Sequence, residues 1–413
     1  MGREAHQEGD ARSAVSETLA VRYPLLPLGL LVAACGASGA RARDTSDEAP
    51  AIPESAEETT AATEPAAEAW AERTLGPTVT AAADLPWLAC RRDPSLERAA
   101  AYLAERRAKG KKAPTARGLE LTLRRFGSPL PSPQASVLSG KALRDEDLRA
   151  RIHISPEARC GLRDATAPNG ERTVVLVAAE SHAVLEPIPT RARVGQFLTL
   201  RATTDPGIRG VRVYLTAAGG NVHTTPVSTD STGAFVARFA VDAPGMVTAQ
   251  VVADLADGPR PVLEALVFAG LEPQDPNDEA ADPVPASADL GDGSLYQWLA
   301  QARGGSPPLT RDERLEAIAR THAERMRGKR VAAHDAGDGL PTDRVARLGV
   351  REVGENVAHA RSLREAHAAL LESPSHRANV LSNRFTHVGI GVARDADGSF
   401  WVTQLFTSPL ERP

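Results

Sequence analysis

The side chains that could do chemistry gather in the last third of the chain. His334 precedes an aspartate, Glu355 lies between a glycine and an asparagine, and His376 follows shortly after a Ser-Pro pair. Two neutral imidazoles and a carboxylate form an ordinary ligand set for zinc or another divalent metal, with one position left open for water. A glutamate beside such a pair could act as general base on that water. These residue types are compatible with a metal or acid–base site.

Each of these residues also has a structural interpretation. His376 and Glu355 could hydrogen-bond across a sheet and fix loops, and His334 could be exposed to solvent in a loop of Ala, Gly and Asp. A Ser-His-Asp triad that uses Ser373 or Ser375 with His376 is not expected, because neighbours on one helical turn do not point at each other. The choice between ligand and structural roles stays open at this stage.

Helices must position these residues. Thr310-Arg-Asp-Glu313 has the pattern of a capping box and begins a predicted helix, on whose apolar face His322 is expected to pack in the core. A second capping box begins at Ser362. Ser373 and the proline after it supply an N-cap and an N1 residue for a third helix, which places His376 in the first turn. There the helix dipole disfavours imidazolium. His359 and His367 are expected on helix surfaces.

Two predicted strands, residues 386–393 and 399–406, complete this region. Residues 395–398 (Asp-Ala-Asp-Gly) between them have hairpin-turn composition. Helices and an antiparallel sheet in one unit, residues 290–413, predict an α+β domain.

These segments resemble the CAP superfamily (cysteine-rich secretory protein, antigen 5, pathogenesis-related 1) in its short bacterial form. The resemblance rests on motifs that follow the family's order: Ala319-Arg-Thr-His-Ala-Glu-Arg-Met326, His334-Asp335, Pro341-Thr-Asp-Arg344, Val353-Gly-Glu-Asn-Val-Ala358, Ser373-Pro-Ser-His-Arg-Ala-Asn-Val-Leu381, Phe385-Thr-His-Val-Gly-Ile-Gly391 and Trp401-Val-Thr-Gln404. It implies an α-β-α sandwich with a surface cleft, which two histidines and two glutamates line in many members.

The motifs carry three cleft positions over to this chain, namely His334, Glu355 and His376, which are also the candidate metal ligands. Glu372 lies near the family's second glutamate, where the local alignment slips by one residue. His387, on a predicted strand edge, would flank the cleft. The resemblance implies binding of lipids, metals or proteins more often than catalysis.

The middle of the chain has a different character. Residues 186–271 contain short β-prone runs separated by Gly or Pro turns, which predicts an all-β immunoglobulin-like sandwich that carries no catalytic constellation. Residues 272–289 are rich in proline and acidic side chains and form a predicted linker.

Residues 85–182 are predicted to be an α+β degenerate CAP-like repeat. Residues 93–106 agree with residues 312–325 at a constant offset, and later segments echo the C-terminal domain in the same order. This segment has no Gly-Glu-Asn motif. We therefore expect it to be catalytically empty and to act as a docking surface.

The N-terminal residues predict where the protein is located. An apolar run before Cys35 has the length of a signal-peptide core, and Val-Ala-Ala-Cys35 resembles a lipobox in which the cysteine is lipidated. Residues 1–35 are thus the predicted signal peptide, with a true start expected near Val21. Residues 36–84 are predicted to be an acidic, disordered tether. A lipid anchor predicts a membrane partner and an envelope location, with secretion as the alternative, and this compartment permits a Cys90–Cys160 disulfide.

Composition narrows the functions that remain. The 413 residues are 24% charged and 42% hydrophobic, which excludes a multi-spanning membrane protein and a wholly disordered chain. The net charge of −5 is spread over both signs, so no nucleic acid is expected as a partner. The favoured function is a binding module for a small hydrophobic ligand, a glycan or a protein. The alternatives are a metal-dependent, peptidase-like hydrolase and a purely structural spacer.

Overall fold

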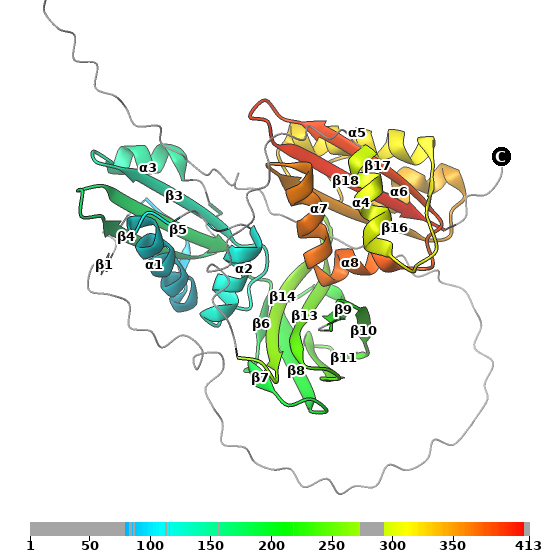
Figure 1. Ribbon diagram of the computed structural model, residues 1–413, viewed down its shortest axis with the longest axis horizontal. Helices are drawn as coiled ribbons and strands as arrows, with labels where there is room; N and C mark the ends of the chain where they lie inside the picture. Colours follow the sequence, from blue (N-terminus) through cyan, green and yellow to red (C-terminus); the bar gives the residue numbers. More distant parts are fainter. Residues whose placement is uncertain are drawn as a thin grey trace, which may run out of the picture.

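The computed structural model describes residues 79–81, 85, 87–111, 114, 116–152, 154–155, 157–217, 219–272 and 293–408. Cys35, the predicted signal peptide, and nearly all of the predicted tether and linker lie outside these residues. The described part is a mixed α/β protein with several sheets, arranged in three units that follow one another along the chain (Figure 1). Within it, every helix is too short or too polar to span a membrane.

The N-terminal unit is a sheet covered by helices. Helix α1 packs on β4 and β5 through a buried face that includes Leu96 and Leu103. The strand order is β1-β4-β5-β3, and β2 pairs with β4. Cys90 and Cys160 form a disulfide with their Cα atoms 6.0 Å apart. The elements are β1 (Val79–Ala81), β2 (Arg91–Arg92), α1 (Pro94–Ala108), α2 (Ala116–Arg125), β3 (Gln134–Gly140), α3 (Asp145–Arg151), β4 (Arg159–Thr166) and β5 (Arg172–Ala179).

The middle unit consists of two sheets packed face to face on one apolar core. Their strand orders are β10-β9-β13-β14-β7 and β11-β12-β8-β6, and among the described strands of this unit only β7 is paired in parallel. The elements are β6 (Ala183–Leu185), β7 (Arg191–Ala192), β8 (Phe197–Thr204), β9 (Arg209–Thr216), β10 (Val222–Thr225), β11 (Val227–Thr229), β12 (Ala234–Ala240), β13 (Gly245–Leu255) and β14 (Gly258–Ala269).

The two sheets differ in how much solvent they face. Strands β8 and β12 alternate between buried and more exposed residues, as expected when one face meets the core and the other meets water. Strand β13 is buried at nearly every position. Its odd-numbered residues from Val247 to Ala253 join the sandwich core, whereas Gln250 and Val252 point the other way and are still buried. The outer face of β13 is therefore covered by another unit.

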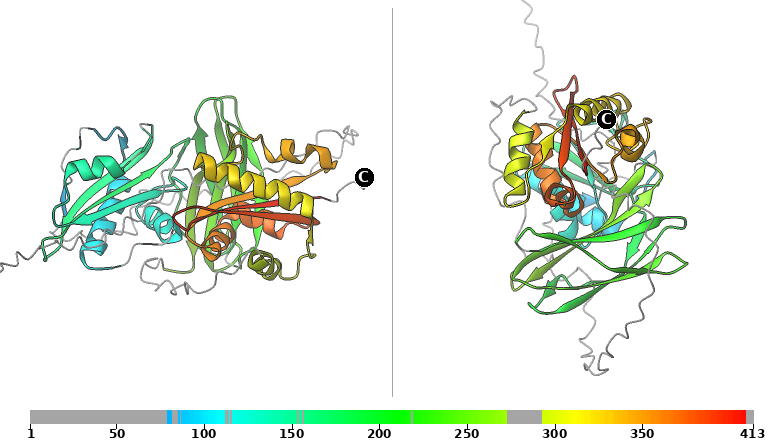
Figure 2. Two further views of the ribbon diagram at one scale, coloured as in Figure 1. Left: turned by 90° about the horizontal axis from the view of Figure 1, so that it is seen from above. Right: turned by 90° about the vertical axis from the view of Figure 1, so that its right-hand side faces the viewer.

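The C-terminal unit has three layers. Helix α5 packs on one face of the sheet β15-β17-β18-β16, and α4, α7 and α8 pack on the other (Figure 2). The elements are α4 (Gly293–Arg303), β15 (Thr310–Arg311), α5 (Glu313–Lys329), α6 (Pro341–Val345), a 3-10 turn (Ala346–Leu348), β16 (Val353–Ala360), α7 (Leu363–Glu372), α8 (Pro374–Leu381), β17 (His387–Arg394) and β18 (Phe400–Thr407).

Helix α5 lies unusually close to β17. A Cβ atom added to Gly389 would lie 2.2 Å from the backbone carbon of Leu315, and one added to Gly391 would lie 2.1 Å from that of Ala319. Glycine at these two strand positions is what allows helix and sheet to approach.

Three local predictions need correction. Asp312, and not Thr310, caps α5, because Thr310 is in a strand and its N–H donates to Thr386 O. His359 lies in β16 and not on a helix, and its ring stacks on Trp401 with centroids 4.0 Å apart. His367 does lie on a helix, but its ring is half-buried against Trp298.

Candidate functional site

Glu355 is the centre of a buried polar cluster in the C-terminal unit. It lies in the middle of β16, and its side chain is fully buried. His334 Nδ1 lies 2.5 Å from Glu355 Oε1, and Arg344 donates to Oε2. Both carboxylate oxygens are therefore engaged by side chains of the segment that precedes β16.

The elements around Glu355 hold this geometry by backbone contacts. The loop that carries His334 turns around Asp335, whose Oδ1 accepts from the N–H groups of Gly337, Asp338 and Gly339. Arg344, in the short helix α6, donates to His334 O at 2.7 Å. Loop and helix are thereby fixed against each other.

Helix α8 supplies His376 from the other side. Asn379 donates to Glu355 O, and Asn356 donates to His376 O. These two asparagines also bond each other, which links α8 to β16. The chain thus brings His334, Glu355 and His376 into one buried region, and all three side chains are fully buried.

His322 belongs to the same region. It is buried on α5, as its position on the apolar face predicts, but its neighbours are polar. Its Nδ1 lies 3.0 Å from Asp338 Oδ2, its Nε2 lies 2.9 Å from Ala333 O, and that nitrogen is 3.8 Å from Glu355 Oε1. Asp338 and Arg344 were not predicted as site residues, although Arg344 belongs to the motif Pro341-Thr-Asp-Arg344. Most of their partners lie in other elements, so the spacing within one element gave no signal.

The charges in this cluster are well defined. Burial alone would raise the pKa of Glu355, but Arg344, His322 and His334 outweigh it and lower this pKa to about 2. Burial lowers the pKa of His334, and burial together with His334 lowers the pKa of His376 well below its ordinary value. At neutral pH the cluster therefore holds an ionised carboxylate and two neutral imidazoles.

Three imidazole nitrogens in the cluster have no hydrogen-bond partner within the part of the chain that the structure describes. They are His334 Nε2 and both ring nitrogens of His376, each buried. Free nitrogens suit a metal ion, but Glu355 is already engaged by Arg344 and His334. Among the described residues, no three His, Cys, Asp or Glu side chains converge in a way that could hold a metal ion. The three-ligand set of His334, Glu355 and His376 thus does not fit a metal in this arrangement.

The two remaining predicted cleft residues lie elsewhere. Glu372 is the last residue of α7, is exposed, and lines a small cavity with Arg117 and Glu264 of the other units. His387 begins β17, and its Nδ1 lies 2.8 Å from Thr386 Oγ1. Within the described residues, no hydrogen bond or ion pair joins either side chain to Glu355, His334 or His376.

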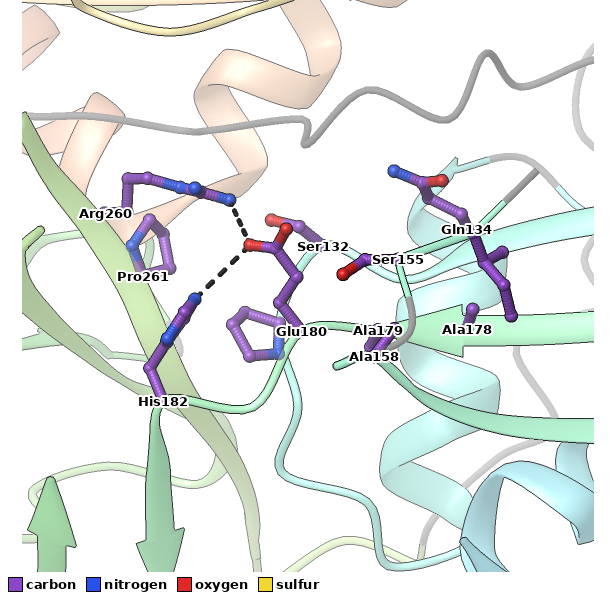
Figure 3. A pocket seen from close by; sticks show the side chains of 12 residues that line it. Ser132, Gln134, Ser155, Ala158, Ala178, Ala179, Glu180, His182, Arg260 and Pro261 are labelled. Carbon is purple, nitrogen blue, oxygen red and sulfur yellow. Dashed lines mark hydrogen bonds and ion pairs between the residues drawn. The ribbon is translucent and has the colours of Figure 1, made fainter. Parts of the chain in front are cut away.

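A second site, which sequence analysis missed, is an open pocket of about 270 Å³ between the N-terminal and middle units (Figure 3). Glu180 projects into it, accepting from Arg260 at 2.9 Å and lying 3.3 Å from His182 Nε2. These contacts pair the charged groups of the pocket with one another. Its lining comes from two units, which no local motif could reveal.

The comparisons assign the C-terminal unit to a class. A unit with an α-β-α arrangement and this His-Glu-His cluster matches the family model described as "Cysteine-rich secretory protein family" (CAP) over residues 299–406. The Bacillus subtilis protein YkwD is 34% identical over 104 residues, which is 24% of this chain and 40% of YkwD. The C-terminal unit is a CAP domain, as predicted.

Solved structures were also similar to part of the chain. An outer surface protein from Borrelia burgdorferi is 22% identical to this chain, with a TM-score of 0.27. The match covers 28% of this chain and 90% of that protein. The venom allergen-like protein 4 of Schistosoma mansoni has 15% identity, coverages of 30% and 92%, and a TM-score of 0.23.

Proposed function

We propose that this protein is a cell-envelope lipoprotein whose CAP domain acts as a binding module. The observation that carries the proposal is the state of Glu355. Its carboxylate is ionised, fully buried and engaged by Arg344 and His334, so it is poorly placed to take a proton from a water molecule. What the cluster offers to a ligand is the free nitrogens of His334 and His376.

The chemistry of these nitrogens favours one of the three predicted ligand classes. A neutral imidazole donates from one nitrogen and accepts at the other. A glycan, which carries many hydroxyl groups, can satisfy both, whereas a purely hydrophobic ligand would leave buried polar atoms unpaired. A glycan or a hydroxyl-rich group is therefore the favoured ligand, and a small hydrophobic molecule or a protein segment is the alternative.

Titration calorimetry on the full chain tests this proposal. A soluble chito-oligosaccharide is one probe, and a fatty acid such as palmitate is the other. Saturable heat with the sugar that disappears in a His334→Ala, His376→Ala double variant is expected. Saturable palmitate binding instead would identify the ligand as hydrophobic. If neither probe saturates, or if the double variant binds as well as the native protein, His334 and His376 are not the binding site.

The alternative is a metal-dependent hydrolase, and one observation favours it. A carboxylate bonded to one nitrogen of a histidine, with the other nitrogen free, is the usual arrangement around a metal-ligating histidine. His334, Glu355 and the free Nε2 have this form. In this alternative Glu355 would orient His334 and would not ligate the metal, and zinc or another divalent metal would be held by the free nitrogens of His334 and His376 and would polarise a water. One equivalent of zinc taken up by the native chain, and none by the double variant, would favour this alternative.

The predicted lipid anchor at Cys35 gives the proposed location. The Cys90–Cys160 disulfide supports it, since disulfides persist mainly in oxidising compartments outside the cytosol. In detergent phase separation, we expect the native protein to partition into the detergent phase and a Cys35→Ser variant to stay in the aqueous phase. Recovery of the native protein from the medium without an acyl group would indicate secretion.

We also propose that residues 85–182 are a degenerate copy of the CAP domain. The strand connections support this proposal. The sheet orders are β2-β4-β5-β3 and β15-β17-β18-β16, and in both the first pair is parallel and the other two are antiparallel.

The helices begin in the same way in both units. Asp93 caps α1 and Asp312 caps α5, and each side chain accepts from the N–H groups two and three residues later. A Cβ atom on Gly161 would lie 2.1 Å from the backbone carbon of Leu96, as one on Gly389 would lie 2.2 Å from that of Leu315. Asp93 and Leu96 precede Asp312 and Leu315 by the same number of residues, so the match extends over the helix and the strand.

The same register locates what the copy lacks. Leu405 pairs with both Gly389 and Glu355, whereas Val177 pairs with both Gly161 and Ala135. Ala135 thus stands where the CAP domain has Glu355, and the helix offset places Leu103 where it has His322. Both are buried in an apolar core. This supports a copy without cleft chemistry, used as a docking surface.

The middle unit is proposed to be an immunoglobulin-like sandwich. Two packed, mostly antiparallel sheets with a common core support this assignment. Its role in the chain depends on the outer face of β13.

A further inference from the structure

We propose that the middle unit is a built-in cover over the buried histidines of the CAP domain, His334 and His376. A segment of this chain, residues 250–258, would block access to them, so that a ligand reaches the two histidines only when the two units separate. This inference rests on the proposed function, since a cover matters only for a site that binds something. Its test measures access and not binding.

The first contact lies beside His376. Gln250 Oε1 accepts from the N–H of Ser375 at 3.1 Å, and Gln250 Nε2 lies 3.3 Å from Ser373 Oγ. Ser373 occupies the N-cap of α8 but makes no capping bond to its own helix. Gln250 therefore satisfies an N–H group that an N-cap side chain usually satisfies. A residue of the middle unit thus completes the helix that carries His376.

The second contact lies beside His334. The N–H of Asp335 donates to Asp257 O at 3.3 Å. Asp257 is in the turn that joins β13 to β14, and its side chain accepts from Arg260. The middle unit thus bonds to the residue next to each of the two histidines, at Ser375 and at Asp335.

The face between these two contacts is buried and partly apolar. Val252 and Tyr214 form a small buried cluster against which Ala378 of α8 packs. On the far side of α8, Arg377 Nε donates to Gly220 O at 2.6 Å. Figure 1 shows α8 lying against the end of the sandwich near β13 and β14. Contacts of the middle unit thus reach Ser375, Arg377 and Ala378 of α8.

The polar part of this interface also reaches the N-terminal unit. Gln250 Nε2 donates to Glu264 Oε2 at 3.3 Å, and Glu264 accepts from Arg117 and Arg124 at 3.5 Å each. Glu264 N–H also donates to Pro129 O at 2.8 Å. The N-terminal unit thus contacts the proposed cover through Glu264, and this contact is the docking role that we propose for the N-terminal unit.

Acylation of histidines by diethyl pyrocarbonate measures access directly. Because the ring nitrogens of His376 have no partner and the ring is neutral, access alone limits its reaction. In the native full chain, His334 and His376 should react at least roughly tenfold more slowly than the exposed His223, as expected for a site reached only by local opening. Peptide mass spectrometry gives each rate.

A Gln250→Ala variant should loosen the cover and raise both slow rates several-fold, with His223 unchanged. Gln196→Ala is the matched control, because Gln196 also accepts a backbone N–H, that of Arg193, but within the sandwich. Hydrogen exchange at Ser375 and Asp335 shows in the same samples whether the interface has opened.

Two outcomes would overturn the proposal. The first is a native protein in which His334 and His376 react as fast as His223, which would mean that the two histidines are already accessible. The second is a folded Gln250→Ala variant with faster hydrogen exchange at Ser375 and unchanged acylation rates of the two histidines. This result would mean that the CAP domain by itself shields them. Neither outcome depends on whether the sugar or palmitate binds, so failure of the cover and failure of the proposed function remain distinguishable.

Discussion

Arg344 donates a hydrogen bond to Glu355, and this contact neutralises a carboxylate that has no exposed surface. The pair joins α6 to β16 and orients the carboxylate toward His334. An ionised group that is buried without a partner lowers the free energy of unfolding. The stability of the CAP domain therefore depends on this pair, whatever ligand the protein binds.

Replacement of Arg344 by alanine should destabilise the full chain by about 3–5 kcal/mol, because Glu355 would remain buried without its cation. Chemical denaturation measures the loss. Arg347→Ala is the control, since Arg347 is exposed one turn away, and its effect should stay within about 0.5 kcal/mol. A loss below about 1 kcal/mol for Arg344→Ala would show that the buried pair is not as described.

Acid should destabilise the protein in two stages. The pKa values of His334 and His376 are lowered in the folded state, so the stability that they contribute is present above the unfolded value, near 6.5, and is lost as the pH falls below it. Each buried neutral histidine should cost about 1.4 kcal/mol per pH unit in that range. Scanning calorimetry from pH 7 to 5 should show a smaller slope in His376→Gln than in the native protein or in His223→Gln.

Glu355 contributes the second stage. Its pKa falls from 4.5 to about 2 on folding, so its contribution is present above pH 4.5 and is lost as the pH falls toward 2. The native protein should therefore show a further decrease in melting temperature below pH 4.5, and this decrease should be smaller in a Glu355→Gln variant. An identical acid profile in this variant would contradict the ionised state assigned to Glu355.

Removal of the disulfide should destabilise the N-terminal unit. Cys90 and Cys160 are 70 residues apart, and a loop of this length corresponds to roughly 4 kcal/mol in the chain-entropy description. A Cys90→Ala, Cys160→Ala variant should show this loss in denaturation without reductant. Reductant should destabilise the native protein and leave the variant unchanged. If it affects both equally, the effect does not arise from this disulfide.

The contact between helix α5 and β17 gives a steric prediction. Gly391→Ala places a Cβ atom 2.1 Å from the backbone of Ala319, so strand and helix must move apart, at a cost of at least about 2 kcal/mol. Gly305→Ala is the control, because that position has open space around it and no left-handed backbone. Thermal unfolding of both variants tests this prediction, and equal melting temperatures would contradict it.

Much of the CAP domain could be predicted because its signals are local. The helical spacing of Leu315, Ala319 and His322 identified the buried face of α5, and all three are buried. The start of α5 was wrong by a few residues because Thr310 pairs with β17, and this pairing depends on a strand far along the chain. Local patterns thus gave the element, and tertiary pairing decided its boundary.

The site could be predicted only in part for the same reason. His334, Glu355 and His376 follow motifs, but the partners that set their charges lie in other elements. Glu372, where the alignment slips by one residue, is the last residue of α7. Helix α7 packs on the sheet face opposite to the one that carries the Glu355 side chain. The cleft role of Glu372 therefore stays a prediction.

The two-sided burial of β13 also limits how this chain can be taken apart. Val252 and Tyr214 are apolar or aromatic because α8 lies on them, not because the sandwich needs them. An excised sandwich would present these side chains to water, and sticky apolar surface of this kind promotes self-association. The three units therefore cannot be separated from one another without exposing buried surface. Anyone who expresses the middle unit alone should redesign that face with polar residues first.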